Sequence, residues 1–351
     1  MKIMCKLILV LGFLVMPSTQ ATVILQYHHV SNETPAITSV TPAQFAEQMQ
    51  YLADNQFNVV PLSRVIQALK NKQSLPDKTV AITFDDGYRN IYENARPVLK
   101  KHGFPYAMFL ASQPIDQRIN RMMSWQQIQT IAKEKAEIMN HTYDHVHLIR
   151  KLASETKGQW LSRIKANIKK NEQTIYQRTG QSFKALAYPY GEYNVDIMKM
   201  LSDMGYVAFG QHSGAAGRYS PLTSLPRYPV AVPFSKMSSL KIKMNSLAMP
   251  VLKQQPLESQ LTKEEHRPKL TLTLDTQDIR KSQLMCYVSN QGAHPPVWIS
   301  ENTFYIQAEK RLPAGRSRYN CTAPSKTSNR YYWFSNTWVK PKHNGEWKKE
   351  K

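Results

Sequence analysis

Two adjacent aspartates point to chemistry most directly. Asp85 and Asp86 follow an apolar run at residues 79–83. Because neighbouring carboxylates repel one another, such a pair is unfavourable unless a cation lies beside it. An acidic turn before a helix is the alternative, since Asp-Gly is common in turns. We interpret the pair as catalytic, because the carboxyl ends of parallel strands carry the active sites of α/β folds.

Histidines gather in a second segment, at residues 140–148. His141 and His145 are four residues apart, so one helical turn would place both imidazoles on the same side. Two imidazoles and one carboxylate, with open coordination positions, are typical of a catalytic zinc site. A single histidine is more often a surface or core residue, but three within seven residues favour ligation by His141 and His145. For His147, packing against a helix or supporting a ligand fits equally well.

A tight turn is the third candidate, at residues 187–191 (AYPYG). Its proline and glycine can shape a loop that exposes a backbone N–H group. Such a donor beside a metal ion can hold the oxyanion of a tetrahedral intermediate. Without the other two segments, this one would indicate only a turn.

The elements that must position these residues alternate between short apolar runs and longer amphipathic ones from residue 23 to 249. This alternation predicts a parallel α/β sheet, open or closed into a barrel, with the three candidate segments at strand ends. The expected strands span residues 23–27, 79–83, 106–110, 184–188, 206–209 and 228–232. The expected helices begin at Thr41 and Ser124 or span residues 90–102, 154–178 and 195–204.

The later part of the chain has a different pattern. Residues 250–268 are polar and charged, which predicts a linker. Residues 269–351 alternate in several short runs separated by proline and glycine turns, which is typical of a small all-β, sandwich-like domain. Its aromatic residues 331–334 and Trp338 could stack on sugar rings, although a structural role in the core is the more common one.

The first 21 residues have the features of a signal peptide. Lys2 and Lys6 precede an apolar stretch of ten residues, and small residues stand near Ala21, where a signal peptidase would cleave. Ten residues span about 15 Å as a helix, too short for a bilayer core of about 30 Å. We therefore expect no permanent membrane anchor and a secreted or periplasmic protein, with a catalytic domain at residues 22–249. A buried core helix is the alternative.

Composition narrows the class of protein. With 42% hydrophobic and 10% aromatic residues, the 351-residue chain is not a disordered or fibrous protein. Cys286 and Cys321 remain after cleavage, and we expect them to form a disulfide in an oxidising compartment. The net charge of +21 raises the question of nucleic acid, but the sequence has no recognisable reader motif, and secretion removes that partner. Anionic envelope or matrix polymers are the expected partners of this charge.

In their order, TFDDG (83–87), HTYDH (141–145) and YPYG (188–191) resemble the polysaccharide deacetylases of carbohydrate esterase family 4. LQYHHV (25–30) also resembles the first strand of the bacterial branch that includes poly-N-acetylglucosamine deacetylases. The resemblance covers about residues 22–235. It implies a distorted (β/α) barrel that removes acetyl groups from N- or O-acetylated polysaccharides with one divalent metal ion. We expect Zn²⁺, with Co²⁺ or Ni²⁺ as alternatives.

The resemblance also implies roles for individual residues. The metal ligands would be Asp86, His141 and His145. Asp85 would be the general base that takes a proton from the attacking water, and the backbone N–H of Tyr190 would stabilise the oxyanion. The residues expected to line the substrate pocket are His28, Tyr188 and Pro189. For His28, a structural hydrogen bond inside the barrel is equally plausible.

The sequence departs from the family pattern at two points. The third motif usually begins with an arginine that orients the base, but this chain has Ala187 there. Arg227, from a later strand, is the expected substitute. The usual late Leu-x-His, which supplies the general acid, has no clear match, and His212 is our candidate, with an ordinary loop histidine as the alternative.

We therefore expect a secreted, metal-dependent deacetylase that hydrolyses N-acetyl groups of an amino-sugar polymer. An O-acetyl polysaccharide esterase would have the same metal site and base. A non-catalytic polysaccharide-binding or adhesion protein is a further alternative. The intact set of Asp85, Asp86, His141 and His145 argues against it, because a barrel that had lost its activity would tolerate the loss of any of the four.

Overall fold

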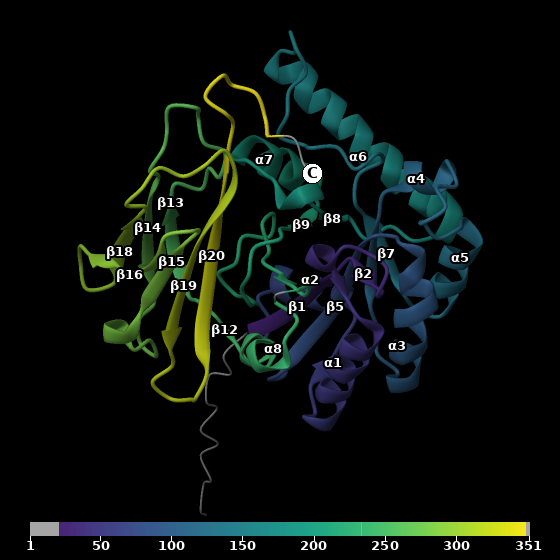
Figure 1. Cartoon of the computed structure of the whole chain (residues 1–351), viewed down its shortest axis with the longest axis horizontal. Coiled ribbons are helices and arrows are strands. Elements are labelled where there is room, and N and C mark those ends of the chain that lie inside the picture. The colour runs from purple at the N-terminus through teal and green to yellow at the C-terminus, as the bar shows by residue number, and fades with distance from the viewer. Residues whose placement is uncertain (1–20, 233, 349–351) are drawn as a thin grey trace, which may run out of the picture.

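A computed structural model describes residues 21–232 and 234–348 (Figure 1). Helices around a parallel sheet form one part, and β-strands from late in the chain form a second part beside it (Figure 1). The signal peptide was predicted for residues 1–21. Of these, residues 1–20 lie outside the described residues. Within the described ranges, no helix is long and apolar enough to cross a membrane.

The first part is built on a curled, mainly parallel sheet. Its strands are β1 (Ala21–Tyr27), β4 (Asn58–Val59), β5 (Thr79–Asp86), β6 (Ala107–Leu110), β7 (Glu137–Asn140), β8 (Ala185–Ala187), β9 (Val207–Phe209), β10 (Ala216–Gly217) and β11 (Tyr228–Pro229). They are arranged β10-β1-β5-β6-β7-β8-β9, with β11 also paired to β1 and β4 to β5. Only β10 pairs antiparallel in this sheet. The predicted fold, a distorted (β/α) barrel followed by an all-β region, is confirmed.

Helices cover the outer face of this sheet (Figure 1). They are α1 (Pro42–Asp54), α2 (Leu62–Lys70), α3 (Arg96–His102), α4 (Ser112–Asp116), α5 (Trp125–Lys133), α6 (Lys157–Thr179), α7 (Val195–Asp203) and α8 (Met237–Met244). The two expected helix starts are correct, because the side chains of Thr41 and Ser124 each accept a hydrogen bond from the third residue of the helix and close a capping box. A small parallel pair, β2 (His29–Val30) and β3 (Ser39–Val40), lies beside the sheet.

Strand β7 was not among the strands expected from the sequence. All four of its residues are buried, and it pairs in parallel with β6 along its whole length. It begins with Glu137, and an acidic residue is unusual in a buried strand. The charge is accommodated because a carboxylate oxygen of Glu137 accepts a hydrogen bond from the backbone N–H of Ser63 at 3.0 Å. This strand matters for function, since His141 follows its last residue.

The second part consists of two antiparallel-rich sheets. One has the order β12-β20-β19-β15-β16, and the other β13-β14-β18-β17. Their strands are β12 (Leu247–Ala248), β13 (Val251–Gln255), β14 (Lys269–Leu274), β15 (Met285–Val288), β16 (Gly292–His294), β17 (Val297–Trp298), β18 (Thr303–Gln307), β19 (Gly315–Pro324) and β20 (Tyr331–Lys340). Cys286 and Cys321 lie opposite each other on β15 and β19 and form the expected disulfide.

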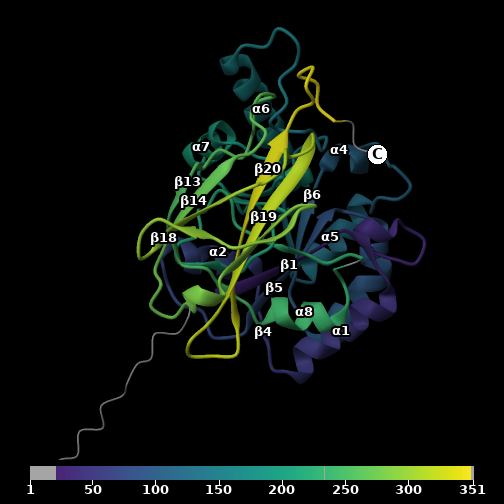
Figure 2. The ribbon, with the colours of Figure 1, turned by 60° about the vertical axis from the view of Figure 1, so that its left-hand side comes forward.

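The predicted linker at residues 250–268 is wrong in part, because β13 lies within it and pairs antiparallel with β14. Its polar residues gave no strand signal, since the strand is largely exposed. The two parts of the molecule are packed together. The rings of Tyr228, on β11, and Trp333, on β20, meet edge-on with centroids 5.5 Å apart. Figure 2 shows β19 and β20 crossing in front of the parallel sheet.

Candidate active site

The candidate residues meet at the carboxyl ends of neighbouring parallel strands. Asp85 and Asp86 are the last two residues of β5, and His141 directly follows β7. The turn at residues 188–191 directly follows β8. Because β5, β6, β7 and β8 are consecutive in the sheet, their ends bring these segments together, as expected for a parallel α/β fold.

Three side chains form a compact cluster. Asp86 Oδ1 lies 3.2 Å from His141 Nε2 and 3.3 Å from His145 Nε2. One ligand atom from each of the three residues lies within 4.8 Å of the others, a spacing that could hold a metal ion. Asp86 and His141 are buried, whereas the side chain of His145 is 28% exposed, so the cluster has one side open to solvent. The structure therefore brings together the three ligands expected from the sequence.

Hydrogen bonding shows that this cluster suits a cation. His141 Nδ1 lies 2.8 Å from the carbonyl oxygen of Ala187, which can only accept, so Nδ1 carries the proton. In the neutral imidazole, Nε2 would then be an acceptor that faces a second acceptor, Asp86 Oδ1. Both atoms are buried, and among the described residues neither has a hydrogen-bond partner. Two such atoms 3.2 Å apart need a cation beside them, and one carboxylate with two imidazoles fits a zinc-type site.

The local charges favour the same conclusion. Burial by itself would raise the pKa of Asp86, but the imidazoles of His141 and His145 hold that pKa well below its usual value. Burial would lower the pKa of His141, but Asp86 and Asp85 outweigh it and raise the pKa. The surroundings thus stabilise positive charge between these groups, and a metal ion satisfies that preference as a proton would.

Asp85 lies beside the cluster in a buried ion pair with Arg227. Two nitrogens of the guanidinium donate to the two carboxylate oxygens at 2.7 and 2.8 Å, and both side chains are fully buried. Burial would raise the pKa of Asp85, but the charge and hydrogen bonds of Arg227 outweigh it, so the pKa is lowered. Arg227 also donates to the carbonyl of Gly210 at 3.0 Å and to the hydroxyl of Thr83 at 3.2 Å. Arg227 therefore contacts the candidate base, as expected of a substitute for the arginine that Ala187 replaces.

Two residues of β1 and its following turn complete the surroundings of Asp85. Gln26 Nε2 donates to Asp85 Oδ2 at 2.7 Å, and His28 Nε2 lies 4.0 Å from the same oxygen. His28 is 21% exposed, so it faces the open side of the site. Gln26 was missed in the sequence, although a polar side chain inside an otherwise apolar strand is a signal that could have identified it.

Tyr190 lies over the cluster. Its ring stacks on the ring of His147 at a centroid distance of 3.7 Å and meets His145 edge-on at 4.6 Å. His147 is held in turn by Glu192, whose carboxylate lies 2.7 Å from His147 Nδ1. His147 therefore supports the loop, and Glu192 is a second residue that the sequence did not reveal.

The expected helical turn between the two histidines is absent. Residues 141–145 form a loop in which Thr142 and His145 have positive φ angles of 65° and 57°. Asp86 and Tyr190 also have positive φ angles, 73° and 60°. Residues with a Cβ atom rarely adopt this left-handed conformation, and such strain is concentrated at functional sites. The cluster is thus formed by strained loops, which a helical periodicity does not predict.

Two residues expected to line the substrate pocket do not reach it. The side chain of Tyr188 is fully buried, and its hydroxyl donates to the carbonyl of Thr223 at 2.7 Å. Pro189 is buried as well. Since both side chains are enclosed by protein, they shape the loop from below, and the sequence-based assignment to substrate contact is not supported.

His212 lies apart from the cluster. It lines a cavity of about 950 Å³ that is bordered by α7 and by the second part of the chain. Burial and the nearby charges of Arg318 and Arg227 lower the pKa of His212 to about 3. An imidazole with this pKa is neutral at physiological pH and lacks the second proton that an imidazolium gives as a general acid. The assignment of His212 as general acid is therefore not supported by its surroundings.

Comparison with known proteins gives the site a context. Residues 72–209 match the family model for polysaccharide deacetylase. A putative polysaccharide deacetylase of Bacillus subtilis, YxkH, is 29% identical over 209 residues, which are 59% of this chain and 71% of that protein. The poly-beta-1,6-N-acetyl-D-glucosamine N-deacetylase of Escherichia coli K12 is 23% identical, over 60% of this chain and 36% of its own length. The protein of the same name in Staphylococcus epidermidis is 30% identical, over 48% of this chain and 59% of its own length.

Solved structures share the fold. The Streptococcus pyogenes deacetylase PplD, in complex with acetate, aligns with a TM-score of 0.58 and 22% identity, over 64% of this chain and 98% of that one. IcaB from Ammonifex degensii aligns with a TM-score of 0.56 and 24% identity, over 65% of this chain and 98% of that one. At these identities the likeness concerns the fold alone.

Proposed function

Since the chain carries a polysaccharide deacetylase domain, we propose that it hydrolyses the N-acetyl groups of an amino-sugar polymer. The observation that carries the proposal is the cluster of Asp86, His141 and His145, open to solvent on one side, beside the ionised pair of Asp85 and Arg227. Two relatives act, by name, on poly-beta-1,6-N-acetyl-D-glucosamine, which makes a polymer of this class our proposed substrate.

Asp86, His141 and His145 would hold one divalent metal ion, for which we propose Zn²⁺. When bound, such an ion supplies Lewis acidity, which polarises a carbonyl group and lowers the pKa of water from about 15.7 towards 7. Because Nδ1 of His141 donates to the carbonyl of Ala187, Nε2 is the nitrogen left to bind the ion.

Asp85 would accept the proton of the attacking water. Its Oδ2 already receives hydrogen bonds from Arg227 and Gln26. Its Oδ1 receives one from Arg227. A carboxylate oxygen can accept two hydrogen bonds, so we assign the proton transfer to Oδ1. The lowered pKa keeps this carboxylate ionised at neutral pH, and the two-point contact with Arg227 fixes its orientation.

The remaining steps need a donor to the oxyanion and an acid for the departing amine. The backbone N–H of Tyr190 would stabilise the oxyanion, because its loop borders the cluster. We propose His28 as the acid in place of His212. His28 lies 4.0 Å from Asp85 and is partly exposed, so its imidazole can reach a substrate bound over the cluster.

We also propose that the enzyme acts outside the cytoplasm, in the periplasm or after secretion. The disulfide between Cys286 and Cys321 supports an oxidising compartment. The net charge of +21 for the whole chain, or 21 − 2 = +19 without Lys2 and Lys6, would hold the protein near anionic envelope or matrix polymers.

Acetate release from a panel of acetylated polysaccharides tests the proposal. We expect release from partially acetylated poly-β-1,6-glucosamine, inhibition by a chelator, and recovery on adding Zn²⁺. An O-acetylated xylan separates an esterase from an N-deacetylase, because release from xylan alone would contradict the substrate class. No release from any polymer by the metal-loaded protein would contradict an enzymatic function.

A further inference from the structure

The Tyr190 loop is contacted by the second part of the chain. Arg316, on β19, donates from Nη1 to the carbonyl oxygen of Tyr190 at 2.6 Å. Its guanidinium carbon also lies 5.9 Å from the centre of the Tyr190 ring. A residue of the C-terminal sheets therefore binds the backbone of the residue whose N–H is the proposed oxyanion donor.

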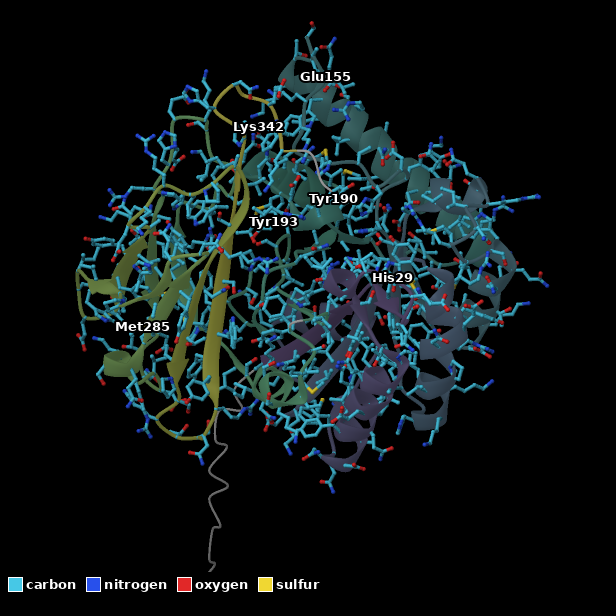
Figure 3. All side chains as sticks on the ribbon, in the orientation of Figure 1. His29, Glu155, Tyr190, Tyr193, Met285 and Lys342 are labelled. Atoms are coloured by element: carbon cyan, nitrogen blue, oxygen red, sulfur yellow. A yellow bond between two sulfur atoms is a disulfide. The ribbon has the colours of Figure 1, made fainter. Side chains whose placement is uncertain are left out.

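Two further contacts hold the same loop from the same side. The hydroxyl of Ser259 donates to the carbonyl of Tyr193. The amide of Asn194 donates to the side-chain oxygen of Gln260 at 2.7 Å. In Figure 3, Tyr190 and Tyr193 lie between the C-terminal sheets and the region of the barrel marked by His29. Residues 190–194 are thus bound at three points by residues that follow the barrel.

The backbone of this loop needs such support. Tyr190 has φ 60° and ψ 1°, and Gly191 follows with φ 69°. The left-handed conformation is unfavourable for tyrosine, so the loop keeps it only where neighbouring contacts over-determine it. The N–H and C=O groups of Tyr190 belong to the two peptide planes that meet at its Cα atom. With φ and ψ held at 60° and 1°, a contact that fixes the carbonyl plane also limits rotation of the N–H plane. On the barrel side, the ring of Tyr190 contacts the rings of His145 and His147.

We propose that Arg316 is a positioning residue for the deacetylation: it fixes the Tyr190 carbonyl, and through it the direction of the Tyr190 N–H towards the reacting acetyl group. The C-terminal sheets are then a working part of the active site rather than a separate module. This inference rests on the proposed function and assigns to the sheets a role within it.

A second arginine provides a matched control. Arg330 also joins the two parts of the molecule, with its guanidinium donating to Asp77 and to the carbonyl of Asn245, both at 2.6 Å. Asp77 precedes β5, at the amino end of the sheet, whereas the Tyr190 loop follows the carboxyl end of β8. Loss of Arg330 therefore weakens the junction between the two parts without touching the loop.

The test compares Arg316→Ala, Arg316→Lys and Arg330→Ala in the full mature chain loaded with Zn²⁺, using a short N-acetylglucosamine oligomer. Loss of a whole oxyanion donor lowers kcat by about 100- to 1,000-fold, so a misdirected one should lower it by about tenfold or more in Arg316→Ala. We expect KM and metal content to stay close to wild type. Lysine can donate to the same carbonyl, so Arg316→Lys should recover most of the loss. Arg330→Ala should keep the wild-type kcat.

Three results would overturn the inference: a wild-type kcat in Arg316→Ala, an equal loss in Arg330→Ala, or no recovery in Arg316→Lys. If the wild-type chain releases no acetate, the proposed function fails instead. The loop can then be followed by amide hydrogen exchange, which should increase at residues 189–194 in Arg316→Ala but not in Arg330→Ala. Unchanged exchange in Arg316→Ala would contradict the positioning role independently of activity.

Discussion

Replacing Arg227 tests the ion pair that we place behind the catalytic base. In Arg227→Ala, Asp85 loses two hydrogen bonds and its only described charge partner within 3 Å, while it stays fully buried. Breaking a buried pair in this way costs about 3–5 kcal/mol of stability, because the remaining charge is uncompensated. The protein can avoid part of this cost by protonating Asp85.

Protonation would also remove the base. Burial raises the pKa of Asp85, and Arg227 supplies the main opposing effect, so without Arg227 that pKa should rise. The acid side of the pH–kcat profile should then move to higher pH. At neutral pH we expect kcat to fall by about 100- to 10,000-fold, the usual contribution of a general base. Arg227→Lys keeps a charge but not the two-point contact, so its kcat should lie between those of the wild type and Arg227→Ala.

Arg96 offers the matched control, since it makes the same two-point contact with Glu134, at 2.7 Å for both bonds, on the surface. Arg96→Ala should cost at most about 1 kcal/mol and leave kcat unchanged. Acetate release across a pH series, with calorimetry on the same samples, measures both quantities. A near-wild-type kcat and an unmoved acid limb in Arg227→Ala would show that Arg227 does not keep Asp85 ionised.

Further predictions concern the metal, the buried histidine and the disulfide. His141→Ala should lose bound metal, and elemental analysis showing stoichiometric metal would contradict its role as a ligand. The pKa of His212 is lowered to about 3, so between about pH 6.5 and 3 the unfolded chain binds a proton that the folded chain does not. The free energy of unfolding should therefore fall as the pH falls, by up to about 1.4 kcal/mol per pH unit. His212→Asn should flatten this dependence in urea unfolding at several pH values, and an unchanged slope would count against it. Cys286 and Cys321 close a loop of 35 residues, so the double serine variant should lose about 4 kcal/mol in urea unfolding, and equal midpoints for the two proteins would be inconsistent with this.

The residues at strand ends could be predicted from the sequence because their signal is local. Asp85 and Asp86 end an apolar run, and such a run bounded by polar residues identifies a buried strand. The histidine pair could also be identified from the sequence, but the backbone conformation that brings its two members together could not. Left-handed residues such as Thr142 and His145 leave no periodic pattern, so the expected helical turn is a loop in the structure.

Non-local pairing accounts for the remaining differences. Arg227 reaches Asp85 because β11 pairs in parallel with β1, which itself pairs with β5, and only the family pattern suggested this residue. The lowered pKa of His212 also depends on the second part of the chain, since one of the charges that lower it, Arg318, comes from β19. Strand β13 lies in a polar segment that looks like a linker, because much of it is exposed. Residues whose environment is set by distant segments could not be judged from local sequence.

The most direct test of the account is acetate release from an N-acetylated glucosamine polymer by wild type and Asp85→Asn, with metal content measured on both. Asparagine has nearly the same shape as aspartate but cannot accept the proton of water as a base. We expect equal metal content in the two proteins and a loss of acetate release by about 100-fold or more in Asp85→Asn. Wild-type release by metal-loaded Asp85→Asn would contradict the assignment of Asp85 as the base.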